Sequence, residues 1–269
     1  MRVPCTNPWA HEHRPQPILA MAKEYPHGAR VAPHRHGRAQ LLFATSGTMR
    51  VTTADSAWIV PPLRAVWIPP GMEHALQMTG ALSMRTLFIT PSAAPFMPDG
   101  SCRVIEVSGL LRALILAAVE EAEDGARAEM IGGLILNELE RAAEVPLRLP
   151  LPRDPRLAAL CRALLDDPTQ DDTLEAWAER AGASARTLAR LFLRETGLTF
   201  GAWRQQARLA EAMAGLALGR SVAEVARAAG YGSASAFTAM FRRALGATPS
   251  QYFDAGAARP SSSPGRAVS

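Results

Sequence analysis

The chain has 269 residues, a length that favours two domains. Apolar residues make up 48% of it, which excludes wholesale disorder, and the net charge of +4 is mildly basic. The cysteines Cys5, Cys102 and Cys161 are far apart and form no paired motif, which is typical of free thiols in a reducing compartment. No long apolar segment precedes Pro15, and the longest apolar run is too short to span a bilayer. We therefore expect a cytoplasmic protein that does not enter the membrane.

Residues 1–17 are expected to form a mobile tail, because they are rich in proline and histidine near the chain end. From 18 to 107 the pattern changes to short apolar segments separated by proline and glycine. This pattern predicts an all-β sandwich or barrel. The predicted turns include Gly47, Pro61-Pro62 and Thr79-Gly80.

Two histidine motifs lie inside this β region. His34 and His36 alternate on an expected strand and therefore point to one face, which Gln40 shares. His74 follows the tight turn 69–71, which places it at the start of the next strand. Three imidazoles from two segments are suited to binding a divalent metal ion.

These motifs resemble the two cupin motifs, H-x-H-x3-E-x6-G and P-x-G-x2-H, and the resemblance implies a jelly-roll barrel. Gln40 stands where the family has a carboxylate, so one donor is neutral and weaker. The candidate ligands of one divalent metal ion are His34, His36, Gln40 and His74. The alternative is that the histidines line a small-molecule pocket or satisfy hydrogen bonds inside the barrel.

Two tryptophans are candidates for effector binding. Trp58 and Trp67 flank the expected barrel strands. They either pack in the core or line a pocket for a small molecule.

Helical periodicity covers 108–144 in two parts, separated near Gly125. The predicted apolar stripes are Leu110, Leu111, Leu114 and Ile115 in the first part, and Met130, Leu134, Ile135 and Leu139 in the second. Such helices can pack on the barrel, pair with a second subunit, or do both. Residues 145–153 contain three prolines without periodicity and are expected to form an extended linker.

The segment 154–254 contains a helix-turn-helix pattern twice, at 173–195 and at 221–243. Gly182 recurs 48 residues later as Gly230, and Phe192 recurs 49 residues later as Phe241. Between 184 and 243 there are nine arginines against three glutamates, a charge balance typical of a DNA-binding surface. Residues 255–269 are expected to form a disordered tail.

This segment resembles the DNA-binding domain of the AraC/XylS family of bacterial transcription regulators. The matching motifs are A-G-A-S-x-R-x-L-x-R-x-F from Ala181, A-x-x-x-G-Y-x-S-x-S-A-F from Ala226 and T-P-S-x-Y from Thr248. The resemblance implies binding to double-stranded promoter DNA, control by a small-molecule effector, a homodimer formed by the central helices, and contact with RNA polymerase. The implied fold is α+β, with an N-terminal cupin domain and a C-terminal helical domain.

The expected DNA contacts lie on the second helix of each pattern. The candidates are Ala185, Arg186, Ala189 and Arg190 in the first, and Ser233, Ser235, Thr238, Ala239 and Arg242 in the second. Arg186 and Arg190 are the strongest candidates, since arginine binds guanine edges and phosphates. The joining helix, 200–218, is about 28 Å long at 1.5 Å per residue. Both helices could therefore enter successive major grooves, about 34 Å apart.

The combined prediction is a ligand-responsive transcription regulator without enzymatic activity. Two alternatives remain open: a metal-dependent cupin enzyme with a DNA-binding appendage, and a regulator that responds to no effector. The enzyme would need a competent metal and a general base, and only Glu73 lies near the histidine motif.

Overall fold

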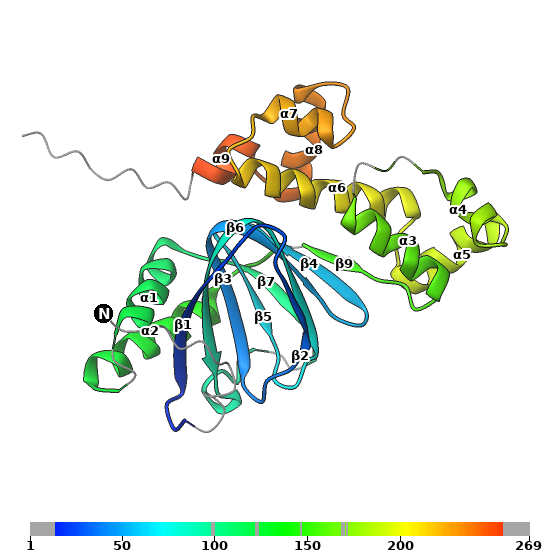
Figure 1. Cartoon of the computed structure of the whole chain (residues 1–269). Helices are drawn as coiled ribbons and strands as arrows, with labels where there is room; N and C mark the ends of the chain where they lie inside the picture. Colours follow the sequence, from blue (N-terminus) through cyan, green and yellow to red (C-terminus); the bar gives the residue numbers. More distant parts are fainter. Residues whose placement is uncertain are drawn as a thin grey trace, which may run out of the picture.

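The computed structural model describes residues 14–97, 100–121, 124–145, 147–167, 170 and 172–254. Strands come first in the chain and helices last (Figure 1). The predicted α+β fold, with a β-rich N-terminal domain and a helical C-terminal domain, is therefore confirmed. Residues 1–13 of the predicted tail at 1–17, and the whole predicted tail at 255–269, lie outside the described residues.

The N-terminal domain is an antiparallel sheet that rolls around a packed interior. Its strands are β1 (Ile18–Tyr25), β2 (Arg30–His34), β3 (Ala39–Thr52), β4 (Ser56–Val60), β5 (Arg64–Ile68), β6 (His74–Ile89), β7 (Arg103–Glu106), β8 (Glu144–Val145) and β9 (Arg148–Pro150). A short 3-10 helix, η2 (Pro91–Ala93), follows β6. The long strands β3 and β6 pair along most of their length, and alternate residues such as Leu42 and Met84 fill the interior.

Two of the predicted turns are wrong. Gly47 lies within β3 and Gly80 lies within β6, and both strands continue past these glycines. Both residues have a positive φ, 75° and 81°, and the β3–β6 register shifts on either side of Ser46. A glycine with positive φ allows a bulge that bends the strand without ending it. A Cβ at Gly47 would lie 2.6 Å from the carbonyl oxygen of Ala81, so the bulge also needs a residue without a side chain.

The helices α1 (Gly109–Glu120) and α2 (Ala126–Arg141) cover one outer face of the sheet (Figure 1). On α2 the buried stripe is Ile131, Ile135 and Leu139. The predicted stripe through Met130 and Leu134 is wrong, because these side chains are 64% and 49% exposed. Neighbouring apolar stripes on one helix have the same period, and only the position of the sheet decides which of them is buried.

The C-terminal domain consists of helices that follow the linker. They are α3 (Pro155–Asp166), α4 (Leu174–Arg180), α5 (Ala185–Thr196), α6 (Phe200–Ala217), α7 (Val222–Ala228), α8 (Ala234–Leu245) and α9 (Pro249–Asp254). Part of the predicted linker also belongs to the sheet, because β9 pairs with β4. In this pair Ser56 lies opposite Pro150, and Trp58 lies opposite Arg148. No helix among the described residues is long and apolar enough to cross a membrane.

The two domains pack against each other along α6, which lies above one end of the rolled sheet (Figure 1). The indole Nε1 of Trp203 donates a hydrogen bond of 2.7 Å to the carbonyl oxygen of Pro150. The guanidinium of Arg50, on β3, contacts the carbonyl oxygen of Leu165 and the carboxylate of Asp166 at the end of α3. These contacts join the helical domain to the linker and to the sheet.

Candidate DNA-binding surface and histidine cluster

The helices α5 and α8 each have a buried apolar face and an exposed polar face. Leu188 and Phe192 on α5, and Phe237 and Phe241 on α8, are buried. Each helix is preceded by a serine whose hydroxyl accepts the backbone N–H of the third helical residue, and each ends at a glycine with positive φ. Caps therefore define both ends of each helix, and the buried apolar face anchors it in the domain while the outer face stays exposed.

The predicted DNA-contact residues lie on these outer faces. Ala185 and Thr238 are half-buried, and the others are exposed: Arg186, Ala189, Arg190, Ser233, Ser235, Ala239 and Arg242. The hydroxyl of Ser233 also caps α8, because its Oγ accepts the backbone N–H of Ala236 at 3.1 Å. That hydroxyl can still donate a hydrogen bond.

Sequence reasoning missed Leu193, which is 50% exposed on α5. It follows Arg186 by seven residues and Arg190 by three, so it shares their helical face. The signal was available, since an apolar residue at this spacing falls outside the buried stripe of Leu188 and Phe192.

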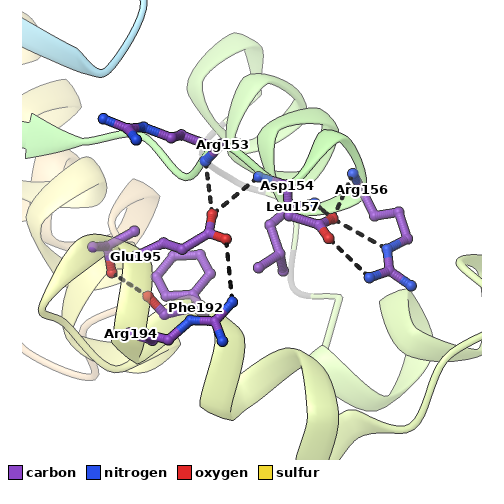
Figure 2. Close-up of polar contacts among 8 residues, drawn as sticks. Arg153, Asp154, Arg156, Leu157, Phe192, Arg194 and Glu195 are labelled. Atoms are coloured by element: carbon purple, nitrogen blue, oxygen red, sulfur yellow. Dashed lines mark hydrogen bonds and ion pairs between the residues drawn. The ribbon is translucent and has the colours of Figure 1, made fainter.

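The end of α5 is tied to the start of α3 (Figure 2). A carboxylate oxygen of Glu195 accepts the backbone N–H groups of Arg153 and Asp154, at 2.8 and 3.0 Å. Asp154 in turn caps α3, as its sequence position before Pro155 predicted. Its hydrogen bonds from the Arg156 guanidinium, and then from backbone N–H groups, lower the pKa of its carboxyl group. The α5 helix is therefore positioned relative to the linker that leaves the sheet.

The three predicted histidines come together at one end of the sheet. His34 ends β2, His36 lies in the loop that follows, and His74 begins β6. Their nearest ring nitrogens all lie within 4.8 Å of one another. The two motifs are joined by the backbone, because the N–H of Gly71 donates to the carbonyl oxygen of His36 at 2.7 Å. The expectation that His34 and His36 share one strand is wrong, since the strand ends at His34 and a loop brings His36 inward.

Hydrogen bonds orient two of the imidazoles. The Nδ1–H groups of His34 and His74 can donate to the carbonyl oxygens of Ala32 and Met72, at 2.8 and 2.9 Å, which leaves each Nε2 as the lone-pair nitrogen. Burial lowers the pKa of His74 to about 4, with smaller contributions from the neighbouring His34 and His36. His74 is therefore neutral at pH 7, the form that binds a metal ion.

Gln40 faces the interior of the sheet, with the same parity as Leu42 on β3. Its Nε2 donates to Thr86 Oγ1 at 3.2 Å, while its Oε1 is buried and has no hydrogen-bond partner among the described residues. The Oε1 atom is thus the oxygen that Gln40 could offer to a ligand.

The two candidate effector residues lie in cores. Trp58 packs in the interior cluster and Trp67 packs under α1 and α2, and each is 3% exposed. A cavity of about 240 Å³ lies elsewhere, between the sheet and the helical domain. Its polar lining includes His27, Thr48 and Arg50, with Asp166 and Glu211 from the helical side.

Known families and proteins match both domains. Residues 17–139 match an AraC-like ligand binding domain, and residues 177–255 match a helix-turn-helix domain. The HTH-type transcriptional regulator NimR of Escherichia coli K12 is 38% identical over 222 residues, which span 81% of this chain and 81% of NimR. The activator RhaR of Klebsiella pneumoniae is 22% identical over 258 residues, 87% of this chain and 91% of RhaR. Among solved structures, ToxT from Vibrio cholerae has 10% identity and a TM-score of 0.38, covering 89% of this chain and 99% of ToxT.

The similarity to NimR spans both domains, and the order of the two matched families is the order seen in the fold. The histidine cluster lies in the ligand-binding part, and the capped helices α5 and α8 lie in the helix-turn-helix part. The chain therefore belongs to the AraC family of transcription regulators, with a helix-turn-helix DNA-binding domain and an AraC-like ligand-binding domain.

Proposed function

We propose that α5 and α8 enter successive major grooves on one face of promoter DNA, and that the protein acts in the cytoplasm as a regulator rather than an enzyme. The observation that carries this proposal is the pair of capped helices with exposed outer faces, joined by the 18-residue α6. At 1.5 Å per residue α6 is about 27 Å long, close to one turn of B-DNA. Its length is therefore suited to placing one recognition helix in each groove.

Footprinting on the DNA upstream of the protein's own gene tests this arrangement. We expect two protected segments about one helical turn apart on the same face of the duplex. If saturating protein protects only one segment of the DNA, the use of both helices is contradicted.

We also propose that the histidine cluster binds one divalent metal ion. The fit rests on His74, whose buried Nε2 has no hydrogen-bond partner among the described residues, and on its neutral state at pH 7. His34 and His36 would supply the other imidazoles. Gln40, whose Oε1 is buried without a hydrogen-bond partner among the described residues, would supply a neutral oxygen. When bound, such an ion would supply a Lewis-acidic centre held by these four side chains.

Two substitutions test the metal site in opposite directions. His74→Ala removes a metal ligand itself and is expected to weaken Zn²⁺ binding by more than about 100-fold. Loss of a residue that only hydrogen-bonds to a ligand already costs about 10- to 100-fold. Gln40→Glu is expected to strengthen it by about tenfold, because an anionic ligand replaces a neutral one. Titration of metal-stripped protein with Zn²⁺ measures both, and His27→Ala, which removes an exposed histidine outside the cluster, is the control. Equal affinity in all four proteins would exclude the site.

We propose that a small molecule in the ligand-binding domain controls DNA binding. The support is the family match over residues 17–139 and the polar cavity that touches both domains. A ligand there would contact Arg50 and Asp166 together and so change how the domains are joined. Thermal unfolding of the whole protein with a library of metabolites tests this, and no stabilising compound, with or without Zn²⁺, would favour a regulator without an effector.

We propose that α1 and α2 bind a second copy of the chain. The support is that this helix pair carries three large apolar side chains, Leu110, Met130 and Leu134, that are between 49% and 64% exposed. Leu134→Glu is expected to convert a dimer into a monomer, as measured by sedimentation. Leu193→Glu, which changes an equally exposed leucine on α5, should leave the mass unchanged. A wild-type monomer at micromolar concentration would exclude this interface.

A further inference from the structure

The outer face of α5 carries a large apolar side chain that the interior of the protein does not use. Leu193 is 50% exposed, although Leu188 and Phe192, its neighbours on the helix, are buried almost completely. The other large exposed apolar side chains among the described residues lie on other elements, at Leu110, Met130, Leu134 and Leu218. Leu193 therefore needs an explanation that concerns α5 itself.

Its position along the helix supplies one. Arg186, Ala189, Arg190 and Leu193 are spaced by three, four and seven residues, and all four are exposed. Residues at this spacing form one stripe along a helix. Homeodomain recognition helices use the same spacing to contact bases along the major groove. A helix that places Arg186 and Arg190 against base edges would thus also place Leu193 there, one turn further on.

The chemistry of the groove then limits what Leu193 can contact. Arginine recognises the O6 and N7 acceptors of guanine, and leucine has neither donor nor acceptor. The apolar group that DNA displays in the major groove is the C5-methyl group of thymine. We propose that Leu193 recognises a thymine methyl group in the half-site bound by α5, next to the bases contacted by Arg190.

The second helix-turn-helix differs at this position. The residue 49 positions after Leu193 is Arg242, while Arg190 corresponds to Ala239. The outer stripe of α5 therefore carries two arginines and ends in apolar Leu193, whereas the corresponding stripe of α8 is uncharged until it ends in Arg242. This arrangement predicts two unlike half-sites: one containing guanine and thymine, and one bound mainly through the backbone.

The inference rests on the proposed binding of DNA by α5, and one experiment tests both separately. Duplexes that bind the full-length protein are selected from a random-sequence pool. Each thymine of the preferred site is then replaced by deoxyuridine, which removes only the methyl group. We expect one replacement to weaken wild-type binding by about fourfold, the effect of one buried methyl-sized group. In Leu193→Ala the same replacement should have no effect.

Two further variants make the result specific. Leu218→Ala removes a leucine that is 43% exposed at the end of α6, outside both recognition helices, and it should keep the full thymine-to-deoxyuridine ratio of the wild type. Leu193→Arg introduces the residue type that α8 has at the corresponding position, Arg242. This variant should bind thymine and deoxyuridine sites equally, and its salt dependence should rise by about one unit through a new phosphate contact. Equal ratios in wild type and Leu193→Ala at every thymine would overturn the inference. If Arg186→Ala and Arg190→Ala also select the same sequences as the wild type, the proposed role of α5 fails as well.

Discussion

Replacing Arg186 or Arg190 by alanine is expected to weaken binding to the preferred DNA site by about 5- to 150-fold, the range of one lost bidentate contact to guanine. Both side chains are exposed on the outer face of α5 and neither stabilises the helix core. The variants should therefore fold like the wild type, and the loss should appear in DNA binding alone. Fluorescence anisotropy with labelled duplexes, at fixed salt, measures it.

Comparison across sequences separates base recognition from phosphate contact. A residue that recognises guanine loses affinity only for sites containing that base, whereas a phosphate contact is lost on every sequence and lowers the salt dependence by about one unit. Arg112→Ala, an exposed arginine on α1, is the matched control and should bind as the wild type does. Unchanged affinity in both α5 variants would remove this helix from the interface.

Replacing Trp203 by alanine is expected to lower the free energy of unfolding by about 3–5 kcal/mol, the usual cost of deleting a buried aromatic side chain. Trp203 is fully buried on α6, with its ring centroid 6.1 Å from that of Phe192 in an edge-to-face arrangement. Its Nε1 also donates to the carbonyl oxygen of Pro150 on β9. The substitution thus removes core packing and a link between the domains at once. Urea unfolding followed by circular dichroism measures the loss.

Two further variants separate the loss of the hydrogen bond to Pro150 from the loss of aromatic packing. Trp203→Phe keeps an aromatic ring but leaves the Pro150 oxygen without its donor, and it should cost about 1–3 kcal/mol. Trp177→Ala removes a half-buried tryptophan whose ring centroid lies 4.3 Å from the Cζ atom of Arg180. This substitution should lower the free energy of unfolding by about 1 kcal/mol. A Trp203→Ala protein as stable as Trp177→Ala would show that the contact between α6 and the linker contributes little.

The helical domain was predictable because its signals are local. Ser221 and Glu224 form a capping box, and the structure contains both hydrogen bonds of that box. Gly182 and Gly230 both have a positive φ, as the breaks in the two predicted helix pairs required. Caps, breaks and 3.6-residue periodicity act within one or two turns, so a sequence displays them directly.

The histidine motifs were predictable only in part. Their residue types and the tight turn before His74 indicated a cluster, and His34, His36 and His74 do come together. The sequence did not show that β2 ends at His34, because the loop that carries His36 depends on a backbone hydrogen bond to Gly71 in another segment. For the same reason, only the structure showed that Gln40 donates to Thr86 on β6.

By itself, the sequence determined the class of each segment: β in the first part, helical in the second, with two matched helix-turn-helix units and two histidine motifs. Only the tertiary structure decided that Ile131 rather than Met130 faces the sheet, that Gly47 bends a strand instead of ending it, and that residues 148–150 add a strand. The physical reason is that local propensity depends on neighbours in the chain. Burial and strand pairing depend instead on partners distant in the chain, which come into contact only when the whole fold forms.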